Sequence, residues 1–121
     1  MTERNSIILV DDNEAIVDSL KTGLLLQGYH CETATDGKSA LELISNTSFD
    51  VMITDFDMPQ MNGLELAKRV KELKPDMKII IMTGYSEKFS HDEAFALGVS
   101  DLLEKPFGLK ELINKIKGIK I

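Results

Sequence analysis

Three aspartates stand where short apolar runs of the chain end. Asp11 and Asp12 follow the run at residues 7–10, and Asp55 follows the run at residues 51–54. If these runs are neighbouring strands, three carboxylates converge, and two carboxylates about 4 Å apart repel by roughly 4 kcal/mol at an effective dielectric constant near 20. A cation would offset this repulsion. Oxygen ligands without histidine or cysteine favour a hard cation such as Mg²⁺, which commonly serves phosphate chemistry.

Two further polar residues lie at the ends of later predicted strands and carry groups that phosphate chemistry needs. Thr83 follows residues 79–82, and its hydroxyl can donate a hydrogen bond to a phosphoryl oxygen. Lys105 follows residues 99–103 and can neutralise a developing phosphoryl charge as a point cation. A carboxylate such as that of Asp55 can itself accept a phosphoryl group and form a covalent intermediate.

Alternating strand and helix patterns determine where these residues lie. Most of the strand candidates are nearly continuous apolar runs, which is typical of strands covered on both faces. The predicted strands are residues 7–10, 51–54, 79–82 and 99–103, with a weaker one at 29–34. Apolar stripes at helical spacing lie between them. Their residues are Ile16, Val17, Leu20 and Leu24 before Gly28; Ala40, Leu41 and Ile44 after Asp36; Leu64, Ala67, Val70 and Leu73 before Pro75; Ala94, Phe95 and Leu97 before Gly98; and Leu109, Leu112, Ile113 and Ile116.

Five successive strand–helix units predict an α/β fold with a parallel sheet and right-handed crossovers. Five units are too few for an eight-fold barrel, which leaves an open, doubly wound, flavodoxin-like (βα)5 domain with the strand order 2-1-3-4-5. In that order the carboxyl ends of strands 1 and 3 flank the point where ligands bind. The topology therefore predicts that the five polar residues gather at the carboxyl edge of the sheet.

The composition is that of one ordinary globular domain, which we expect to span residues 1–121. Hydrophobic residues make up 43% and charged residues 28% of the chain. The net charge of -6 argues against direct nucleic-acid binding. No apolar run approaches the roughly 20 residues that span a bilayer. A single cysteine, Cys31, excludes an internal disulfide, and with no apolar secretory signal at the start this favours a cytoplasmic location.

Four segments, in this order and at these spacings, resemble a response-regulator receiver domain of two-component signal transduction, in the CheY-like superfamily. They are residues 7–12, residues 55–63, Met82-Thr83-Gly84, and Glu104-Lys105-Pro106-Phe107. The resemblance implies that Asp55 is the phosphoacceptor and that Thr83 and Lys105 contact the phosphoryl group. It also implies a cis peptide bond between Lys105 and Pro106.

The resemblance further implies a Mg²⁺ cofactor. Asp12 would bind the ion directly, Asp11 would act mainly through a bound water, and Asp55 and the backbone carbonyl of Asp57 would be further ligands. The phosphoryl group would come from a histidine kinase or a phosphotransfer protein. The signal would leave through the surface of the fourth helix, fifth strand and fifth helix to a downstream protein or output domain.

The same resemblance predicts a switch that catalyses its own phosphorylation and dephosphorylation, and not an enzyme that turns over an external substrate. We expect a monomer or a phosphorylation-dependent dimer, with no membrane partner. Leu102 departs from the family pattern, because many receivers carry Tyr or Phe three residues before the lysine of strand 5. Asp57 and Tyr85 are predicted from position alone to border the path of an attacking water and to tune hydrolysis of the acyl phosphate.

Two other functions remain as alternatives. Asp55-Phe56-Asp57 superficially resembles the nucleophile motif of haloacid-dehalogenase phosphatases. A phosphorylation-independent interaction module could also use the same fold.

Five residues have simpler structural interpretations. Asp12 and Asn13 are residue types that also begin helices. His30 and His91 are interpreted as surface or partly packed residues away from the carboxyl edge, and Cys31 as a small core residue.

Overall fold

The protein folds around one parallel five-stranded sheet, in a computed structural model that describes residues 6–84 and 91–119. The strands are β1 (Ser6–Val10), β2 (His30–Ala34), β3 (Val51–Asp55), β4 (Lys78–Thr83) and β5 (Asp101–Glu104). The helices are α1 (Glu14–Leu26), α2 (Gly37–Asn46), α3 (Gly63–Leu73), α4 (His91–Ala96) and α5 (Leu109–Gly118). All pairings are parallel, in the order β2-β1-β3-β4-β5. The predicted fold class and strand order are confirmed.

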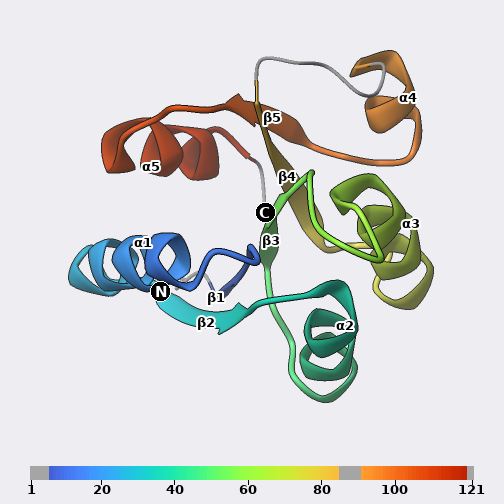
Figure 1. The fold of residues 1–121 in the computed structure, drawn as a ribbon, viewed down its shortest axis with the longest axis horizontal. Coiled ribbons are helices and arrows are strands. Elements are labelled where there is room, and N and C mark those ends of the chain that lie inside the picture. Colours follow the sequence, from blue (N-terminus) through green and yellow to red (C-terminus); the bar gives the residue numbers. More distant parts are fainter. Residues whose placement is uncertain (1–5, 85–90, 120–121) are drawn as a thin grey trace.

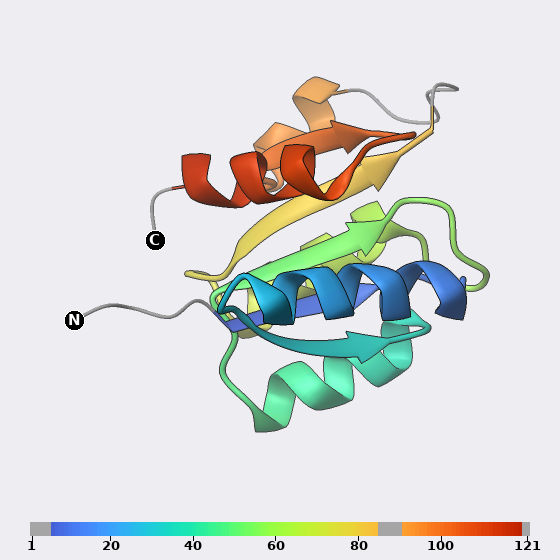
Figure 2. The same ribbon diagram turned by 90° about the vertical axis from the view of Figure 1, so that its left-hand side faces the viewer.

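Helices cover the sheet on both faces. Figure 1 shows α1 and α5 on one face and α2, α3 and α4 on the other. Side chains of β1 alternate between the two sides: Ile7 and Leu9 pack in one apolar cluster, and Ile8 and Val10 pack in the other. All five residues of β3 are buried. The strands run the same way (Figure 2), so their carboxyl ends lie along one edge.

Three helices begin with side-chain caps that the sequence supplies. The side chains of Asn13, Asp36 and Asn62 accept hydrogen bonds from backbone N–H groups of the first turns of α1, α2 and α3. At the start of α2, Ser39 N lies 2.7 Å from Asp36 Oδ1, so Asp36 caps the helix that carries the apolar stripe predicted after it. Gly28 follows α1 with φ 95, a left-handed conformation that favours glycine. α3 ends at Leu73, before Pro75, as predicted.

The strand predicted at residues 99–103 is displaced in the structure. β5 begins at Asp101, because the Val99 N–H donates to the Ala94 carbonyl in the turn that follows α4. Val99 is buried by packing and lies outside the β4–β5 ladder. The apolar stripe predicted for α4 is also wrong in part, since Phe95 is 46% exposed and only Ala94 of this six-residue helix is buried.

None of the helices within residues 6–84 and 91–119 combines the length and apolar character needed to cross a membrane.

Candidate functional site

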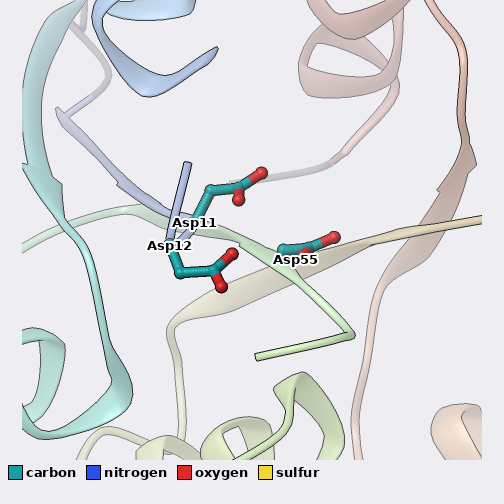
Figure 3. Close-up of side chains that lie close together, drawn as sticks. All are labelled: Asp11, Asp12 and Asp55. Atoms are coloured by element: carbon teal, nitrogen blue, oxygen red, sulfur yellow. The ribbon is translucent and has the colours of Figure 1, made fainter. Parts of the chain in front are cut away.

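The carboxyl edge of the sheet gathers three aspartates, which we call the acidic cluster: Asp11, Asp12 and Asp55. Asp11 and Asp12 follow β1 directly, and Asp55 is the last residue of β3. β1 and β3 are hydrogen-bonded neighbours, so topology alone brings these residues together. Figure 3 shows their side chains gathered at one place. One carboxylate oxygen from each lies within 4.8 Å of the others. Asp11 and Asp55 are buried, whereas Asp12 is exposed.

Lys105 enters the acidic cluster from the end of β5. Its backbone N–H donates to the Thr83 carbonyl at 2.7 Å, which continues the β4–β5 pairing one residue past the strand. Its ammonium nitrogen lies 2.7 Å from Asp55 Oδ1 and 3.5 Å from Asp11 Oδ2. One lysine therefore faces two buried carboxylates, and the negative charge of the site exceeds the positive charge. The Lys105–Pro106 peptide bond is cis, as predicted.

Burial and neighbouring charges act in opposite directions on the ionisation of this pair. Burial raises the pKa of Asp55, the hydrogen bond from Lys105 partly offsets this, and the Asp11 charge adds to the rise. Burial also opposes the charge on Lys105, but its contacts with Asp55 and Asp11 outweigh burial and hold the pKa of Lys105 above its ordinary value. Lys105 is thus a permanent cation at neutral pH, beside a carboxylate whose charge is poorly solvated.

Asp11 has one oxygen satisfied and one that is not. The Asn13 N–H donates to Asp11 Oδ1 at 3.0 Å. Asp11 Oδ2 is buried and accepts no hydrogen bond within the described part of the chain; its nearest cation, Lys105, is at ion-pair distance only. A buried carboxylate oxygen without a donor is costly. Three clustered carboxylates, one of them with an oxygen that accepts no hydrogen bond, offer the oxygen ligands that a hard divalent cation prefers. The residues therefore fit Mg²⁺.

Thr83 ends β4 and is buried beside this edge. Its hydroxyl donates to the Gly84 carbonyl at 2.9 Å, so its predicted contact with a phosphoryl group requires the hydroxyl to change partner. Asp57 is exposed in the loop after β3, and the group predicted to bind Mg²⁺ is its backbone carbonyl. Both roles stay predictions. Tyr85 lies outside the described residues.

The structural interpretations of the remaining residues mostly hold. Asn13 caps α1, so a helix does begin there, while Asp12 belongs to the acidic cluster. His30 is exposed on β2. Cys31 is buried, and burial raises the pKa of its thiol to about 11. His91 is exposed, but it lines a hollow of about 500 Å³ together with Thr83 and Lys105, closer to the site than the sequence suggested.

Sequence reasoning gave no role to Gly63, although the structure places it against Asp55. A Cβ atom at position 63 would lie 2.5 Å from the Asp55 carbonyl oxygen. In the sequence, Gly63 is the last residue of the segment 55–63 that resembles the receiver family, and it follows Asn62, a residue type that often begins helices.

Residues 7–117 match the family described as the response regulator receiver domain. The chain belongs to this family. It is 35% identical over 113 residues to the response regulator SaeR of Staphylococcus aureus (strain USA300), an alignment that covers 93% of this chain and 49% of SaeR. The chain therefore spans about half the length of that relative.

Solved receiver structures share the fold closely. A CheY-like response regulator receiver domain protein from Methanospirillum hungatei JF-1 superposes with a TM-score of 0.89 at 34% identity, covering 95% of this chain and 92% of the other. The chemotaxis protein CheY4 of Vibrio cholerae gives a TM-score of 0.90 at 30% identity, covering 98% and 100%. The domain is thus a receiver of two-component systems, a class that generally acts as a signalling switch.

Proposed function

We propose that this receiver domain is a phosphoryl-accepting switch in which Asp55 takes a phosphoryl group from a phosphohistidine. The observation that supports this most strongly is the buried Asp55 carboxylate, 2.7 Å from the Lys105 ammonium and within 4.8 Å of two further carboxylates. Such a group is poorly solvated and fixed in direction, as a nucleophile should be. The phosphohistidine would belong to a histidine kinase or a phosphotransfer protein.

The transfer forms one bond and breaks another. A carboxylate oxygen of Asp55 attacks phosphorus, the phosphorus–nitrogen bond of the phosphohistidine breaks, and the departing imidazole nitrogen takes up a proton. The product is an acyl phosphate on Asp55. Lys105 remains charged throughout and pairs with the phosphoryl oxygens as their charge develops. The Thr83 hydroxyl turns from the Gly84 carbonyl to donate to the same group.

The residues that would hold Mg²⁺ are Asp11, Asp12 and Asp55 through their side chains and Asp57 through its backbone carbonyl. When bound, the ion would neutralise the charge that the carboxylates and the phosphoryl group bring together. The Asn13 N–H donates to Asp11 Oδ1 and leaves Asp11 Oδ2 without a hydrogen-bond donor, so Oδ2 is available to the ion.

The phosphorylated state would act on a partner through the surface of α4, β5 and α5. Leu102 lies half-buried on β5, packed against the apolar cluster on the α2–α3–α4 face. It has no hydroxyl, so any switching here relies on packing. The partner, the cytoplasmic location and a phosphorylation-dependent dimer belong to this proposal. The phosphatase alternative is disfavoured because Asp57 is exposed and outside the acidic cluster.

Mass spectrometry of the intact protein tests the proposal. The protein is incubated with acetyl phosphate and Mg²⁺, alongside Asp55→Asn and the control Asp76→Asn, which changes an exposed aspartate before β4. We expect the parent and Asp76→Asn to gain the mass of one phosphoryl group and Asp55→Asn to gain none. No gain on the parent, or an equal gain on Asp55→Asn, would exclude Asp55 as the phosphoacceptor.

A further inference from the structure

The loop after Asp55, which we call the β3–α3 loop (residues 56–62), is closed at its base. The Gly63 N–H donates to the Phe56 carbonyl at 2.8 Å, so the last turn of the loop returns to its first residue. The Phe56 N–H donates to the Met82 carbonyl at 2.8 Å, which ties that first residue to β4. The backbone directly after the phosphoacceptor is therefore held by both the sheet and the start of α3.

Gly63 makes this closure possible because it has no side chain. A Cβ atom at position 63 would lie 2.5 Å from the Asp55 carbonyl oxygen and 2.9 Å from the Phe56 Cα. Both contacts are with backbone atoms, which cannot rotate aside. At Gly37, the first residue of α2, an added Cβ would meet the flexible side chain of Met61 instead. A methyl group at position 63 must therefore move the Asp55 backbone or the start of α3.

The path of the loop is fixed between this base and the core. Met58 is buried, and Met61 packs against the same apolar cluster. Gln60 has φ 72, and the Met61 N–H donates to the Pro59 carbonyl at 2.7 Å. A hydrogen bond between residues two apart, around a residue with positive φ, marks a rare and strained turn. Such a turn persists only where its surroundings hold it, so the loop, with Asp57 in it, has one preferred course.

We propose that Gly63 is a positioning residue for the phosphoryl-accepting site. By letting α3 begin against the Asp55 backbone, it sets the direction of the Asp55 carboxylate and of the Asp57 carbonyl. Both groups are candidate Mg²⁺ ligands, so a displacement at Gly63 reaches the ion and the nucleophile together. The inference rests on the proposed function, because it assigns Gly63 a role in that site.

The test compares Gly63→Ala with Gly118→Ala, which adds the same methyl group at the end of α5, where it meets no atom within 4 Å. Mg²⁺ affinity is measured by isothermal titration calorimetry, phosphoryl uptake from acetyl phosphate by mass spectrometry, and stability by thermal unfolding. We expect Gly63→Ala to weaken Mg²⁺ binding at least about threefold and to slow phosphoryl uptake about tenfold to a hundredfold at saturating Mg²⁺. Gly118→Ala should match the parent in both.

A merely structural role for Gly63 would lower the melting temperature and leave the Mg²⁺ dissociation constant unchanged, and that result would overturn the inference. Failure of the proposed function looks different: the parent and Gly118→Ala would gain no phosphoryl group, while the Mg²⁺ comparison would still test Gly63.

A measurement on the parent covers the case in which Gly63→Ala does not fold. Hydrogen exchange of the Gly63 amide is compared with that of Lys74, whose N–H donates to the Val70 carbonyl at the other end of α3. Mg²⁺ should slow exchange at Gly63 at least several-fold more than at Lys74. Equal slowing at both amides would overturn the inference.

Discussion

The ammonium nitrogen of Lys105 lies 2.7 Å from Oδ1 of Asp55, although the two residues are separated by two β-α units of the chain. The pair lies at the carboxyl edge, and a second buried carboxylate, Asp11, is also within ion-pair distance of the same nitrogen. Lys105 thus partly offsets the acidic cluster before any metal binds. It also repels a metal cation that approaches the same oxygens.

This double role predicts that Lys105→Met changes metal binding and phosphoryl transfer in opposite directions. Removing the lysine charge should tighten Mg²⁺ binding roughly threefold to tenfold. It should slow phosphoryl uptake about a hundredfold, because a charge that stabilises the transferred group is lost. Titration calorimetry and time-resolved mass spectrometry measure the two effects. Lys110→Met, on the exposed side of α5, is the control. Weaker Mg²⁺ binding in Lys105→Met would contradict the prediction.

Removal of Mg²⁺ should reverse the stability order of the parent and Asp12→Asn. In EDTA the three carboxylates of the acidic cluster repel one another without a cation between them. Asp12→Asn removes one of these charges, so it should unfold at a higher urea concentration than the parent. At saturating Mg²⁺ the parent should be the more stable protein, because binding to the folded state alone stabilises it. Urea unfolding followed by circular dichroism gives both midpoints. The same order in both buffers would show that Asp12 is not part of a metal site.

The capping carboxylate of Asp36 should make stability depend on pH. Asp36→Ala should cost about 1 kcal/mol at neutral pH, because the Ser39 N–H loses its acceptor. The hydrogen bond from Ser39 holds the pKa of Asp36 below its ordinary value of 3.8. The folded protein therefore loses this proton more readily than the unfolded chain, and the contribution present above pH 3.8 disappears as the pH falls through the folded pKa.

Asp36→Asn separates the effect of the capping hydrogen bond from that of the negative charge. Asparagine caps a helix about as well as aspartate does, but it does not titrate. Urea unfolding of the parent and both variants is compared from about pH 5 to pH 3. The difference in unfolding free energy between the parent and Asp36→Ala should shrink as the pH falls over this range. The difference between Asp36→Asn and Asp36→Ala should stay constant. A constant advantage of the parent would rule out the carboxylate as the titrating cap.

The left-handed conformation of Gln60 predicts that glycine is the better residue at this position. Gln60→Gly should be about 1 kcal/mol more stable than Gln60→Ala, because alanine keeps the steric cost of φ 72 and glycine does not. The comparison between two small residues removes the effect of losing the glutamine side chain. Denaturant midpoints measured side by side decide it, and equal midpoints would mean that the turn relaxes in solution.

The sequence predicts the strand order and the gathering of four charged residues because both follow from topology. β1 and β3 are mostly apolar, and a parallel sheet places the residues at their carboxyl ends along one edge. The metal-binding and phosphoryl-contacting roles of Asp12, Asp55 and Lys105 stay predictions, since the geometry fits them without testing them.

Other features depend on contacts that no local pattern encodes. Val99 begins the strand predicted at residues 99–103, yet its N–H donates to the Ala94 carbonyl, so the strand begins two residues later than predicted. Phe95 directly follows Ala94 in α4, and consecutive residues of a helix point in different directions, so Ala94 is buried while Phe95 is 46% exposed. The contact of Gly63 with the Asp55 backbone arises only when the β3–α3 loop closes.

The Lys105–Asp55 pair joins the end of the last strand to the end of the third, while Asp11 comes from the first. The site therefore needs residues from the ends of β1, β3 and β5, and Lys105 follows a strand that is held in place by pairing with β4. Under the proposed function, copies in which β5 has not paired with β4 lack the Lys105 ammonium beside Asp55 and should accept phosphoryl groups more slowly than folded copies.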